Sequence, residues 1–369
     1  MKLRIAQFAP LTESVPPKGY GGTELVASLL TEQLVQRGHD VTLFASGDSI
    51  TKAKLVSVCD RALRLATEIP MRRWQAYDQR ALLKLKSMAG QYDIIHNHMG
   101  WQALPFLDQL DVPVVSTNHN PVKDYCLDIY LTYKHMPYIS ISNAYRRLNH
   151  PDELNYVATV YNGIDLDLYE TSELKDPADR QYLVFLGRIC QDKGTAEAIR
   201  VARALKQTLK IAGKVDPADE AYYQEQVAPH LGDFGDYKIE YIGEVDDQQK
   251  KALLANAIAT IYPIDFEEPF GLVMAESMAS GTPVVAFKRG SVPELIEDGV
   301  TGLVVETEAQ MVERFPEVLS IKARDCVERV RKNFSKEAMT DAYEAVYQKL
   351  VGAAPKQNEK SNVYARANK

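Results

Sequence analysis

The stretch ATIYPIDFEEPFGLVMAESMASGTPVVAF, residues 259–287, decides the fold of this 369-residue chain. Its pattern predicts an apolar strand at 259–262, a polar loop, a helix at 271–279 and a second strand at 283–287. Two strands joined by a helix run parallel, because the helical crossover returns the chain to the same end of the sheet. The stretch therefore predicts one unit of a parallel sheet covered by helices.

The same alternation of strands and helices extends over most of the chain and falls into two series. The second series starts with strands at 182–186, 209–212 and 239–242, and the first starts with a strand at 3–8 and a helix at 23–37. We therefore predict an α/β protein with two doubly wound, Rossmann-like domains, residues 1–168 and 169–335. A helix at 336–351 follows, and residues 352–369 have the polar, unpatterned sequence of a disordered tail.

Composition excludes several classes of protein. Hydrophobic residues make up 46% of the chain, charged residues 25%, and the charged positions are spread throughout. No apolar run approaches the roughly 18 residues of a membrane-spanning helix, and the first residues lack the pattern of a secretory signal. The cysteines, Cys59, Cys126, Cys190 and Cys326, are too scattered to indicate a disulfide framework or a zinc site. We expect a protein of the reducing cytoplasm.

The net charge of -7 is unevenly distributed. Residues 1–168 hold 17 basic and 17 acidic residues, yet within them residues 61–86 hold seven basic and only two acidic ones. An acidic protein with one basic segment is not expected to bind nucleic acid. The segment, which contains Trp74 and Tyr77, suits contact with an anionic lipid surface or an anionic substrate. The alternative is a solvated helical face without a partner.

Open parallel sheets bind ligands at the carboxyl ends of their strands, and three such positions fall inside the decisive stretch. Glu268 follows the first strand, Gly271 opens the helix, and Glu276 lies more than a turn inside it. The free amides of a first helical turn suit a phosphate, and a flanking carboxylate suits the hydroxyls of ribose or a sugar. The alternative makes Glu276 a solvated residue of the helix and Glu268 a partner of the helix dipole at its N-terminus. The PFG and ASGTPVV motifs favour the ligand site.

Two further glycine-containing loops follow strands. Arg188 and Lys193, in GRICQDKG, suit a diphosphate, although the loop lacks the Walker spacing and is otherwise a solvated turn. Gly21 and Gly22, in YGGTE at residues 20–24, permit close backbone approach to a ligand. The sequence around them does not match GxGxxG, so a nicotinamide cofactor is not indicated.

Six of the seven histidines precede residue 151, and three of them, His96, His98 and His119, directly follow strands. Their spacing fits no metal-binding motif, so a metal site is not predicted. His119 suits either contact with a ligand or a structural hydrogen bond. Asp165 and Asp167 form a DxD pair, which we interpret as structural because it lies at the predicted hinge.

In their order and spacing, these motifs resemble those of retaining glycosyltransferases of family 4 (glycosyl transferases group 1). The similarity rests on YGGTE, DIIHNH, STNHN, FLGRICQDKG, FEEPFGLVMAESMASGTPVVAF and GSVPELIEDGVTGLVV, and the Glu-x7-Glu element of Glu268 and Glu276 is its hallmark. The family has the GT-B architecture, in which two Rossmann-like domains face a central cleft. By resemblance, the helix at 336–351 packs back on the first domain.

The resemblance implies transfer of a sugar from a nucleotide diphosphate donor with retention at the anomeric carbon, without metal or cofactor. Arg188 and Lys193 are implied to hold the diphosphate, Glu268 to bind the donor sugar, and His119 to contact it near the reacting carbon. The implied donor-binding positions are Gly21, Gly22, Gly243, Val245, Phe270, Gly271, Leu272 and Glu276.

Among donors used in the family, we favour a UDP-hexose, and UDP-glucose in particular. The acceptor is expected to be a glycan, a lipid-linked sugar or a small molecule, in exopolysaccharide or cell-envelope synthesis. Two alternatives remain open: a nucleotide-sugar epimerase of GT-B-like architecture, and a non-catalytic module that binds a nucleotide sugar or a membrane. A cytoplasmic enzyme in peripheral contact with the inner face of the membrane fits the basic segment.

Overall fold

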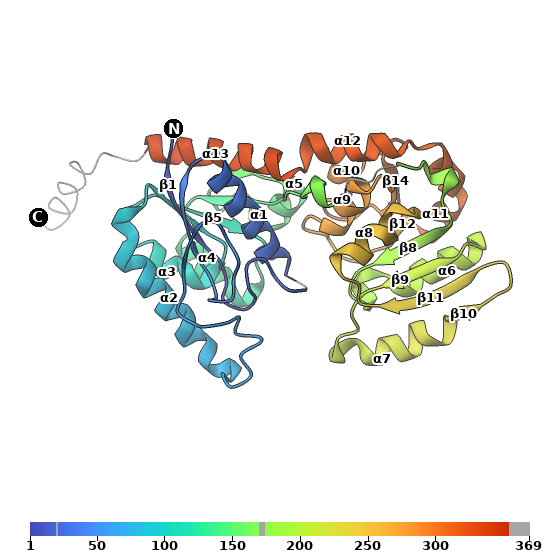
Figure 1. Ribbon diagram of the computed structural model, residues 1–369, viewed down its shortest axis with the longest axis horizontal. Coiled ribbons are helices and arrows are strands. Elements are labelled where there is room, and N and C mark those ends of the chain that lie inside the picture. Colours follow the sequence, from blue (N-terminus) through green and yellow to red (C-terminus); the bar gives the residue numbers. More distant parts are fainter. Residues whose placement is uncertain (20, 170–173, 354–369) are drawn as a thin grey trace, which may run out of the picture. The chain divides into compact units, whose positions relative to one another are not determined.

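The computed structural model describes residues 1–19, 21–169 and 174–353, and the chain divides into two compact units (Figure 1). Unit 1 comprises Met1–Ser140, His150–Val160 and the chain from Thr340 onward, and unit 2 comprises Ile141–Asn149 and Tyr161–Met339. Tyr20 of the YGGTE motif and most of the predicted tail, residues 354–369, lie outside the described residues. The first two residues of that tail end the helix α13 (Lys336–Ala353).

Unit 1 contains a seven-stranded, wholly parallel sheet in the order β3-β2-β1-β4-β5-β6-β7. Its strands are β1 (Arg4–Phe8), β2 (Asp40–Phe44), β3 (Lys54–Val56), β4 (Ile94–Asn97), β5 (Val114–Asn118), β6 (Tyr138–Ser140) and β7 (Tyr156–Thr159). The strand order reverses between β1 and β4. In a doubly wound sheet, such a reversal creates the crevice in which ligands bind. The loops after β1 and β4 therefore occupy the most favourable position for a site in this unit.

The helices of unit 1 are α1 (Gly22–Gln36), α2 (Trp74–Met88), α3 (Leu104–Leu107), α4 (Asp124–Thr132) and the part of α13 from Thr340 onward. Helix α1 ends where Gly38 adopts a left-handed conformation with φ of 86°, the C-terminal stop predicted from the sequence. The span 50–90, for which the sequence indicated only helical character, contains β3 and a 3₁₀ turn besides α2. A three-residue edge strand has too few residues for a periodic pattern.

Unit 2 contains a second seven-stranded sheet, in the order β10-β11-β9-β8-β12-β13-β14. Its strands are β8 (Tyr182–Leu186), β9 (Leu209–Ala212), β10 (Gly232–Asp233), β11 (Lys238–Gly243), β12 (Ala257–Tyr262), β13 (Val284–Phe287) and β14 (Gly302–Val305). All neighbours are parallel except the short edge pair β10 and β11. Here the order reverses between β8 and β12, which places the loops after these two strands side by side.

The helices of unit 2 are α5 (Asn143–Leu148), α6 (Thr195–Leu205), α7 (Glu220–Tyr222), α8 (Asp247–Ala255), α9 (Leu272–Ala279), α10 (Val292–Leu295), α11 (Glu308–Arg314), α12 (Ala323–Asn333) and the start of α13. The sequence pattern also predicts one helix at 218–231, and this segment is helical but is not one regular α-helix. The chain there passes from α7 into a π-helical turn and then a 3₁₀ turn. Pro229 has no backbone N–H to donate, so the regular α-helical pattern cannot continue through it.

The core of unit 2 lies on both faces of its sheet. In β8, Leu183 and Phe185 pack into one buried cluster, whereas Val184 and Leu186 pack into another. Alternate residues of a strand point to opposite faces, so a strand covered by helices on both sides is apolar throughout. This explains the uninterrupted apolar sequence YLVFL.

The division into units differs from the boundary predicted at 168/169. Residues 141–149 and 161–168 belong to unit 2, and so does the start of α13. Glu294 of α10 explains the first of these assignments, because its carboxylate accepts hydrogen bonds from the backbone N–H groups of Asn143 and Ala144 at the start of α5. The Tyr161 hydroxyl donates to the same carboxylate at 2.7 Å.

Candidate functional site

A cation, a carboxylate and a phenol meet at the strand reversal of unit 2. Lys193 follows β8 and places its Nζ 2.9 Å from Oε2 of Glu268, which follows β12. The hydroxyl of Tyr262, the last residue of β12, donates to the same oxygen at 2.7 Å and accepts from Lys193 at 3.2 Å. The structure thus brings together two predicted site residues that are far apart in the sequence.

Gly194 allows the loop after β8 to approach the loop after β12 closely. It has a left-handed backbone, with φ of 75°, and a Cβ at this position would lie 2.0 Å from the carbonyl oxygen of Pro263. Only glycine permits that approach, because any side chain would collide with backbone. The Lys193 ammonium also lies 4.4 Å from the centre of the Phe266 ring, a cation–π distance.

The N-terminus of α9 lies directly after this cluster. Gly271 precedes the helix in a left-handed conformation, and within the described residues no side chain caps its first-turn amides. These N–H groups are donors that an anion can use, and the helix dipole favours negative charge at the same point. Leu272, the first helical residue, is partly buried against the core.

Glu276 lies inside α9 and is only 5% exposed. Its Oε1 lies 2.7 Å from Nζ of Lys250, which belongs to α8. Burial opposes the charged amine, but the Glu276 carboxylate outweighs this effect and raises the pKa of Lys250. Burial, together with Glu276, also raises the pKa of Tyr169. The buried carboxylate is therefore charge-compensated, with its orientation fixed by a partner from a neighbouring helix.

Arg188 follows β8 as predicted but has different partners from Lys193. Its Nη1 lies 3.7 Å from Oδ2 of both Asp216 and Asp219, and 45% of its side chain is exposed. An exposed guanidinium keeps donors free for a further anion, because its planar fork has five N–H groups. The two predicted diphosphate-binding cations thus have separate carboxylate partners within unit 2.

The remaining predicted positions of unit 2 comprise one glycine at a strand end and two apolar residues that pack against the core. Gly243 ends β11, and its carbonyl accepts a hydrogen bond from the Gly213 N–H at 2.9 Å. Val245 is partly buried against the core. Phe270 is 2% exposed, and its ring centre lies 5.9 Å from that of Phe334. The Phe270 side chain therefore belongs to the core, and its carbonyl oxygen accepts a hydrogen bond from the Ser291 hydroxyl at 2.8 Å.

In unit 1, the predicted residues follow β1 and β5, the strands on either side of β4. Gly21 precedes α1 and Gly22 begins it, after the loop that follows β1. His119 follows β5, and its Nε2 lies 2.9 Å from Nδ1 of His98, which follows β4. Burial lowers the pKa of His119 to about 4, so its imidazole is neutral at pH 7.

His96 lies within β4 and is fully buried. Its ring nitrogens bond to the hydroxyls of Tyr347 and Thr117, at 2.6 and 2.7 Å. Because both nitrogens are engaged, His96 is a structural residue that joins α13 to the sheet of unit 1. Asp165 and Asp167 both pair with Lys336 at 2.5 and 2.8 Å, in agreement with the structural interpretation of the DxD pair. Among the described residues, no group of three or more His, Cys, Asp or Glu side chains is arranged to hold a metal ion.

Two family models match the chain, one in each series of strands. The model "Glycosyltransferase Family 4" matches residues 20–168, and the model "Glycosyl transferases group 1" matches residues 170–339. The chain belongs to this glycosyltransferase family. The two matched segments together account for most of its length.

Individual relatives and solved structures agree with this family assignment. The enzyme is 25% identical over 339 residues to an uncharacterised glycosyltransferase of Methanocaldococcus jannaschii, covering 81% of this chain and 85% of the relative. It is 25% identical to the phosphatidyl-myo-inositol mannosyltransferase of Mycolicibacterium smegmatis, with 82% and 81% covered. The structure of Anabaena HepE in complex with UDP-glucose superposes with a TM-score of 0.70 at 18% identity, over 94% of this chain and 100% of that one. The fold is GT-B.

The basic segment of this glycosyltransferase forms a loop, a 3₁₀ turn and α2. All seven of its cations are exposed, namely Arg61, Arg64, Arg72, Arg73, Arg80, Lys84 and Lys86. Met71 is 72% exposed and Leu83 58% exposed among them. No helix in the described part of the chain is long and apolar enough to cross a bilayer.

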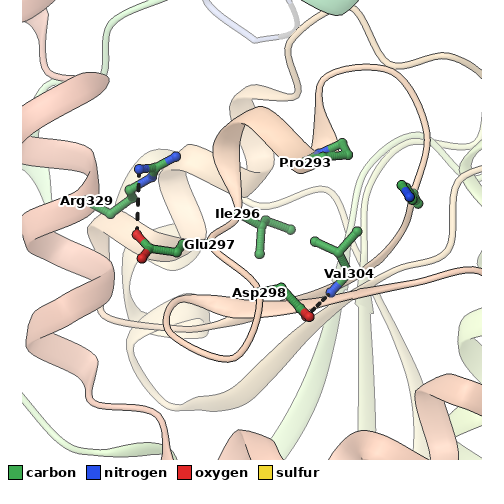
Figure 2. Close-up of a pocket in the computed structure, with 7 residues that line it drawn as sticks. Pro293, Ile296, Glu297, Asp298, Val304 and Arg329 are labelled. Carbon is green, nitrogen blue, oxygen red and sulfur yellow. Dashed lines mark hydrogen bonds and ion pairs between the residues drawn. The ribbon is translucent and has the colours of Figure 1, made fainter.

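A separate hollow of about 420 Å³ lies on the surface of unit 2 (Figure 2). Its lining comes from α10, β14, α12 and the loops around them, and consists of Lys288, Pro293, Ile296, Glu297, Asp298, Val304 and Arg329. None of the predicted site residues lines it. Its charged groups neutralise one another, since Arg329 lies 3.7 Å from Glu297.

Three residues were missed: Tyr262 and Lys250 contact predicted site residues, and Gln7 reaches His119 through His98. Tyr262 ends a strand beside Glu268, a position at which the strand-end rule could have found it. Gln7 is the one polar residue among the buried positions of β1, and a single polar residue in an otherwise apolar strand could have indicated a specific role for it. Lys250 lies among several charged residues of α8, and nothing in its local sequence distinguishes it from them.

Proposed function

We propose that this glycosyltransferase transfers a hexose from a UDP-sugar to an acceptor with retention at the anomeric carbon and without a metal ion. The observation that carries the proposal is the cluster of Lys193, Glu268 and Tyr262 beside the N-terminus of α9. A cation and a row of free amides together suit a diphosphate, while the carboxylate suits the hydroxyls of its sugar.

The chemistry follows from where charge develops. As the glycosidic bond to the diphosphate breaks, negative charge grows on the leaving phosphate oxygens. Lys193, Arg188 and the amides around Gly271 would stabilise this charge, the task that a metal ion performs in other phosphate chemistry. The leaving phosphate can then accept the proton of the acceptor hydroxyl on the same face of the sugar, so no protein nucleophile is required.

The roles of the other residues follow the same assignment. Glu276, held by Lys250, would bind the ribose hydroxyls, and the segment from Gly243 to Val245 would border the base. His119, neutral at pH 7, would contact the donor sugar. Gly21 and Gly22 would line the phosphate side. Phe270 and Leu272 would contribute their backbone.

For the donor, we favour UDP-glucose. The structural neighbour HepE was crystallised with UDP-glucose, and the same fold accommodates that ligand at 18% identity. For the acceptor, we favour a glycan or a lipid-linked molecule of exopolysaccharide or cell-envelope synthesis. A relative named for transfer to phosphatidyl-myo-inositol supports a lipid acceptor.

We also propose that the basic segment 61–86 contacts an anionic membrane from the cytoplasmic side. Its exposed cations suit anionic headgroups, and exposed apolar side chains such as Met71 and Leu83 suit the region just below them. A lipid-linked acceptor would be presented at that surface.

Thermal stabilisation by nucleotides tests the donor site. UDP, GDP and ADP are added separately to the wild-type enzyme and to Arg188→Ala, and the rise in Tm is measured. A ligand at a hundred times its Kd adds about 2.7 kcal/mol to the free energy of unfolding. We expect UDP to stabilise the wild type and Arg188→Ala to lose most of that effect. Arg200→Ala is the matched control, because Arg200 is also exposed and paired with two carboxylates.

Product analysis then separates the alternatives. Incubation with UDP-glucose and candidate acceptors should release UDP and give a glycosylated acceptor. A sugar of changed configuration that is still attached to UDP would identify an epimerase. Nucleotide binding with no turnover on any acceptor would favour a binding module, and stabilisation by none of the three nucleotides would contradict the proposed donor site.

A further inference from the structure

A chain of buried hydrogen bonds joins β1 to the two histidines of unit 1. Oε1 of Gln7 lies 2.8 Å from Nε2 of His98, and Nδ1 of His98 lies 2.9 Å from Nε2 of His119. Gln7 is fully buried and His98 is 3% exposed, so water cannot substitute for these contacts. The side chains approach because Gln7 lies in β1, which pairs with β4, and His98 directly follows β4.

The amide of Gln7 fixes where each proton lies. Its Nε2 donates to the Tyr347 hydroxyl at 3.1 Å, so its Oε1 faces His98. An amide oxygen only accepts, and His98 must therefore have its proton on Nε2. Burial lowers the pKa of His98 well below its usual value, so the ring is neutral and its Nδ1 is an acceptor. His119 must then donate from Nε2, which leaves its own Nδ1 unprotonated.

The other end of the Gln7 amide is equally constrained. Because the Tyr347 hydroxyl accepts from Gln7, its own proton goes to Nδ1 of His96, 2.6 Å away. His96 then donates from Nε2 to Thr117, whose hydroxyl lies 3.1 Å from that of Tyr343. From His119 through Gln7 to Thr117, every member of the network has one consistent role. A reversed Gln7 amide would reverse all of them together.

We infer that Gln7 and His98 are positioning residues that hold His119 in its neutral Nε2–H tautomer, so that Nδ1 accepts a hydrogen bond from a hydroxyl of the donor sugar. The inference rests on the proposed function for the identity of the ligand. His119 then accepts a hydrogen bond through Nδ1 and does not donate one there. Gln7 and His98 determine this although neither touches the substrate. The Nδ1 acceptor selects ligands that present a hydroxyl there.

A purely structural role would predict a different pattern of effects. If the network only stabilised unit 1, loss of any one hydrogen bond would reduce stability and leave the catalytic constants of the folded enzyme unchanged. If the network positions His119, loss of the Gln7 acceptor alone should impair sugar transfer. Binding of UDP, which has no sugar, should not change.

The experiment compares Gln7→Met with Tyr343→Phe. Gln7→Met removes both hydrogen bonds of the amide, including the acceptor of the His98 Nε2 proton. Tyr343→Phe removes one hydrogen bond at the far end of the same buried network and leaves the Gln7 contacts in place. Methionine nearly preserves the volume of the side chain. The tautomers are observed by ¹⁵N NMR of histidine-labelled enzyme, with His119→Asn to assign the His119 signals. Steady-state transfer from UDP-glucose and the Kd of UDP are measured on the same samples.

In the wild type, we expect a protonated Nε2 and a bare Nδ1 on His119. In Gln7→Met, this tautomer should become mixed, and kcat/KM should fall about 10- to 100-fold while the Kd of UDP changes less than twofold. Tyr343→Phe should keep the tautomer unchanged and kcat/KM within about threefold of the wild type. Wild-type His119 protonated on Nδ1, or a tautomer unchanged in Gln7→Met, would overturn the inference. Absence of transfer in the wild type would instead contradict the proposed function, because the tautomer is observed independently of turnover.

Discussion

Lys193 and Glu268 lie 75 positions apart in the sequence, and their side chains meet at 2.9 Å between Nζ and Oε2. The contact joins the loops after β8 and β12, the two strands between which the order of the sheet reverses. The side chain of the lysine is 23% exposed and that of the glutamate 10%, so the pair is mostly buried but still accessible to solvent. Each residue fixes the other, and a ligand that engages both finds the cation and the carboxylate already oriented.

Replacement of Lys193 by alanine should therefore impair catalysis more than folding. Loss of one preorganised donor to developing charge costs about 10²- to 10³-fold in kcat. We expect a fall of that size in kcat for sugar transfer, measured in steady state with saturating donor. Lys322→Ala is the control, since Lys322 makes an exposed pair with Asp176 at 2.9 Å. A Lys193→Ala enzyme within threefold of the wild type would remove this residue from the proposed machinery.

Replacement of Lys250 by methionine should weaken binding of the nucleotide itself. Without Nζ, the Glu276 carboxylate loses its 2.7 Å partner in a buried position, and an unpaired buried charge is costly. We expect the Kd of UDP, measured by calorimetry, to rise about tenfold, equivalent to about 1.4 kcal/mol. Lys250→Arg should recover part of the loss. If both variants bound UDP as the wild type does, Glu276 would not be the ribose ligand.

The contrast between these two pairs shows what the sequence could and could not predict. Lys193 and Glu268 were identified because each lies in the loop after an apolar strand, and the carboxyl ends of parallel strands meet at one edge of the sheet. Lys250 was not identified, because its contact with Glu276 depends on the packing of α8 beside α9. The local sequence of a helix does not show which of its lysines will pack against a neighbouring helix.

The fold shows the same division. Buried strands such as β8 and β12 have continuous apolar sequences, so both were located from the sequence to within two residues. The edge strands β3 and β10 were missed, and the mixed helical segment after α7 was predicted as part of one helix, because short or exposed elements have no strong periodicity. The assignment of 141–149 to unit 2 depends on Glu294, a contact across about 150 residues that no local pattern encodes.

Gly194→Ala should destabilise unit 2 strongly. The new Cβ would lie 2.0 Å from the Pro263 carbonyl oxygen, and the backbone would have to move. Gly299→Ala is a matched control, because Gly299 has nearly the same φ, 77°, but no atom within 4 Å of the added Cβ. We expect about 1 kcal/mol for Gly299→Ala and more than about 3 kcal/mol for Gly194→Ala, measured by urea unfolding. Equal losses would mean that backbone conformation alone sets the cost.

Stability should decrease on the acid side because of the buried histidines. Burial depresses the pKa of His96, His98 and His119, the last to about 4, whereas the unfolded chain protonates near pH 6.5. Unfolding therefore takes up protons between about pH 6.5 and 4, and stability is lost as pH falls through that range. Each proton taken up contributes about 1.4 kcal/mol per pH unit.

Urea unfolding at pH 7.5, 6.5 and 5.5 measures this slope. His119→Asn should reduce it by about one proton. A wild-type stability that did not fall between pH 6.5 and 5.5 would contradict the burial of these rings in unit 1.

The basic segment should bind vesicles through charge. Arg72 and Arg73 are adjacent, exposed and next to the exposed Met71, so Arg72→Glu/Arg73→Glu reverses two charges at the proposed point of contact. Each cation near an anionic surface contributes about 1 kcal/mol, so we expect binding to vesicles rich in phosphatidylglycerol to weaken at least tenfold in co-sedimentation. Arg331→Glu/Lys332→Glu makes the same charge change on an exposed turn of α12 and should have little effect.

Binding of the wild-type enzyme to these vesicles should also weaken as the salt concentration rises, because the Debye length shortens to about 8 Å at physiological ionic strength. Equal loss in both double variants would mean that net charge, and not this segment, governs the attraction, and no binding by the wild type would leave 61–86 a solvated face.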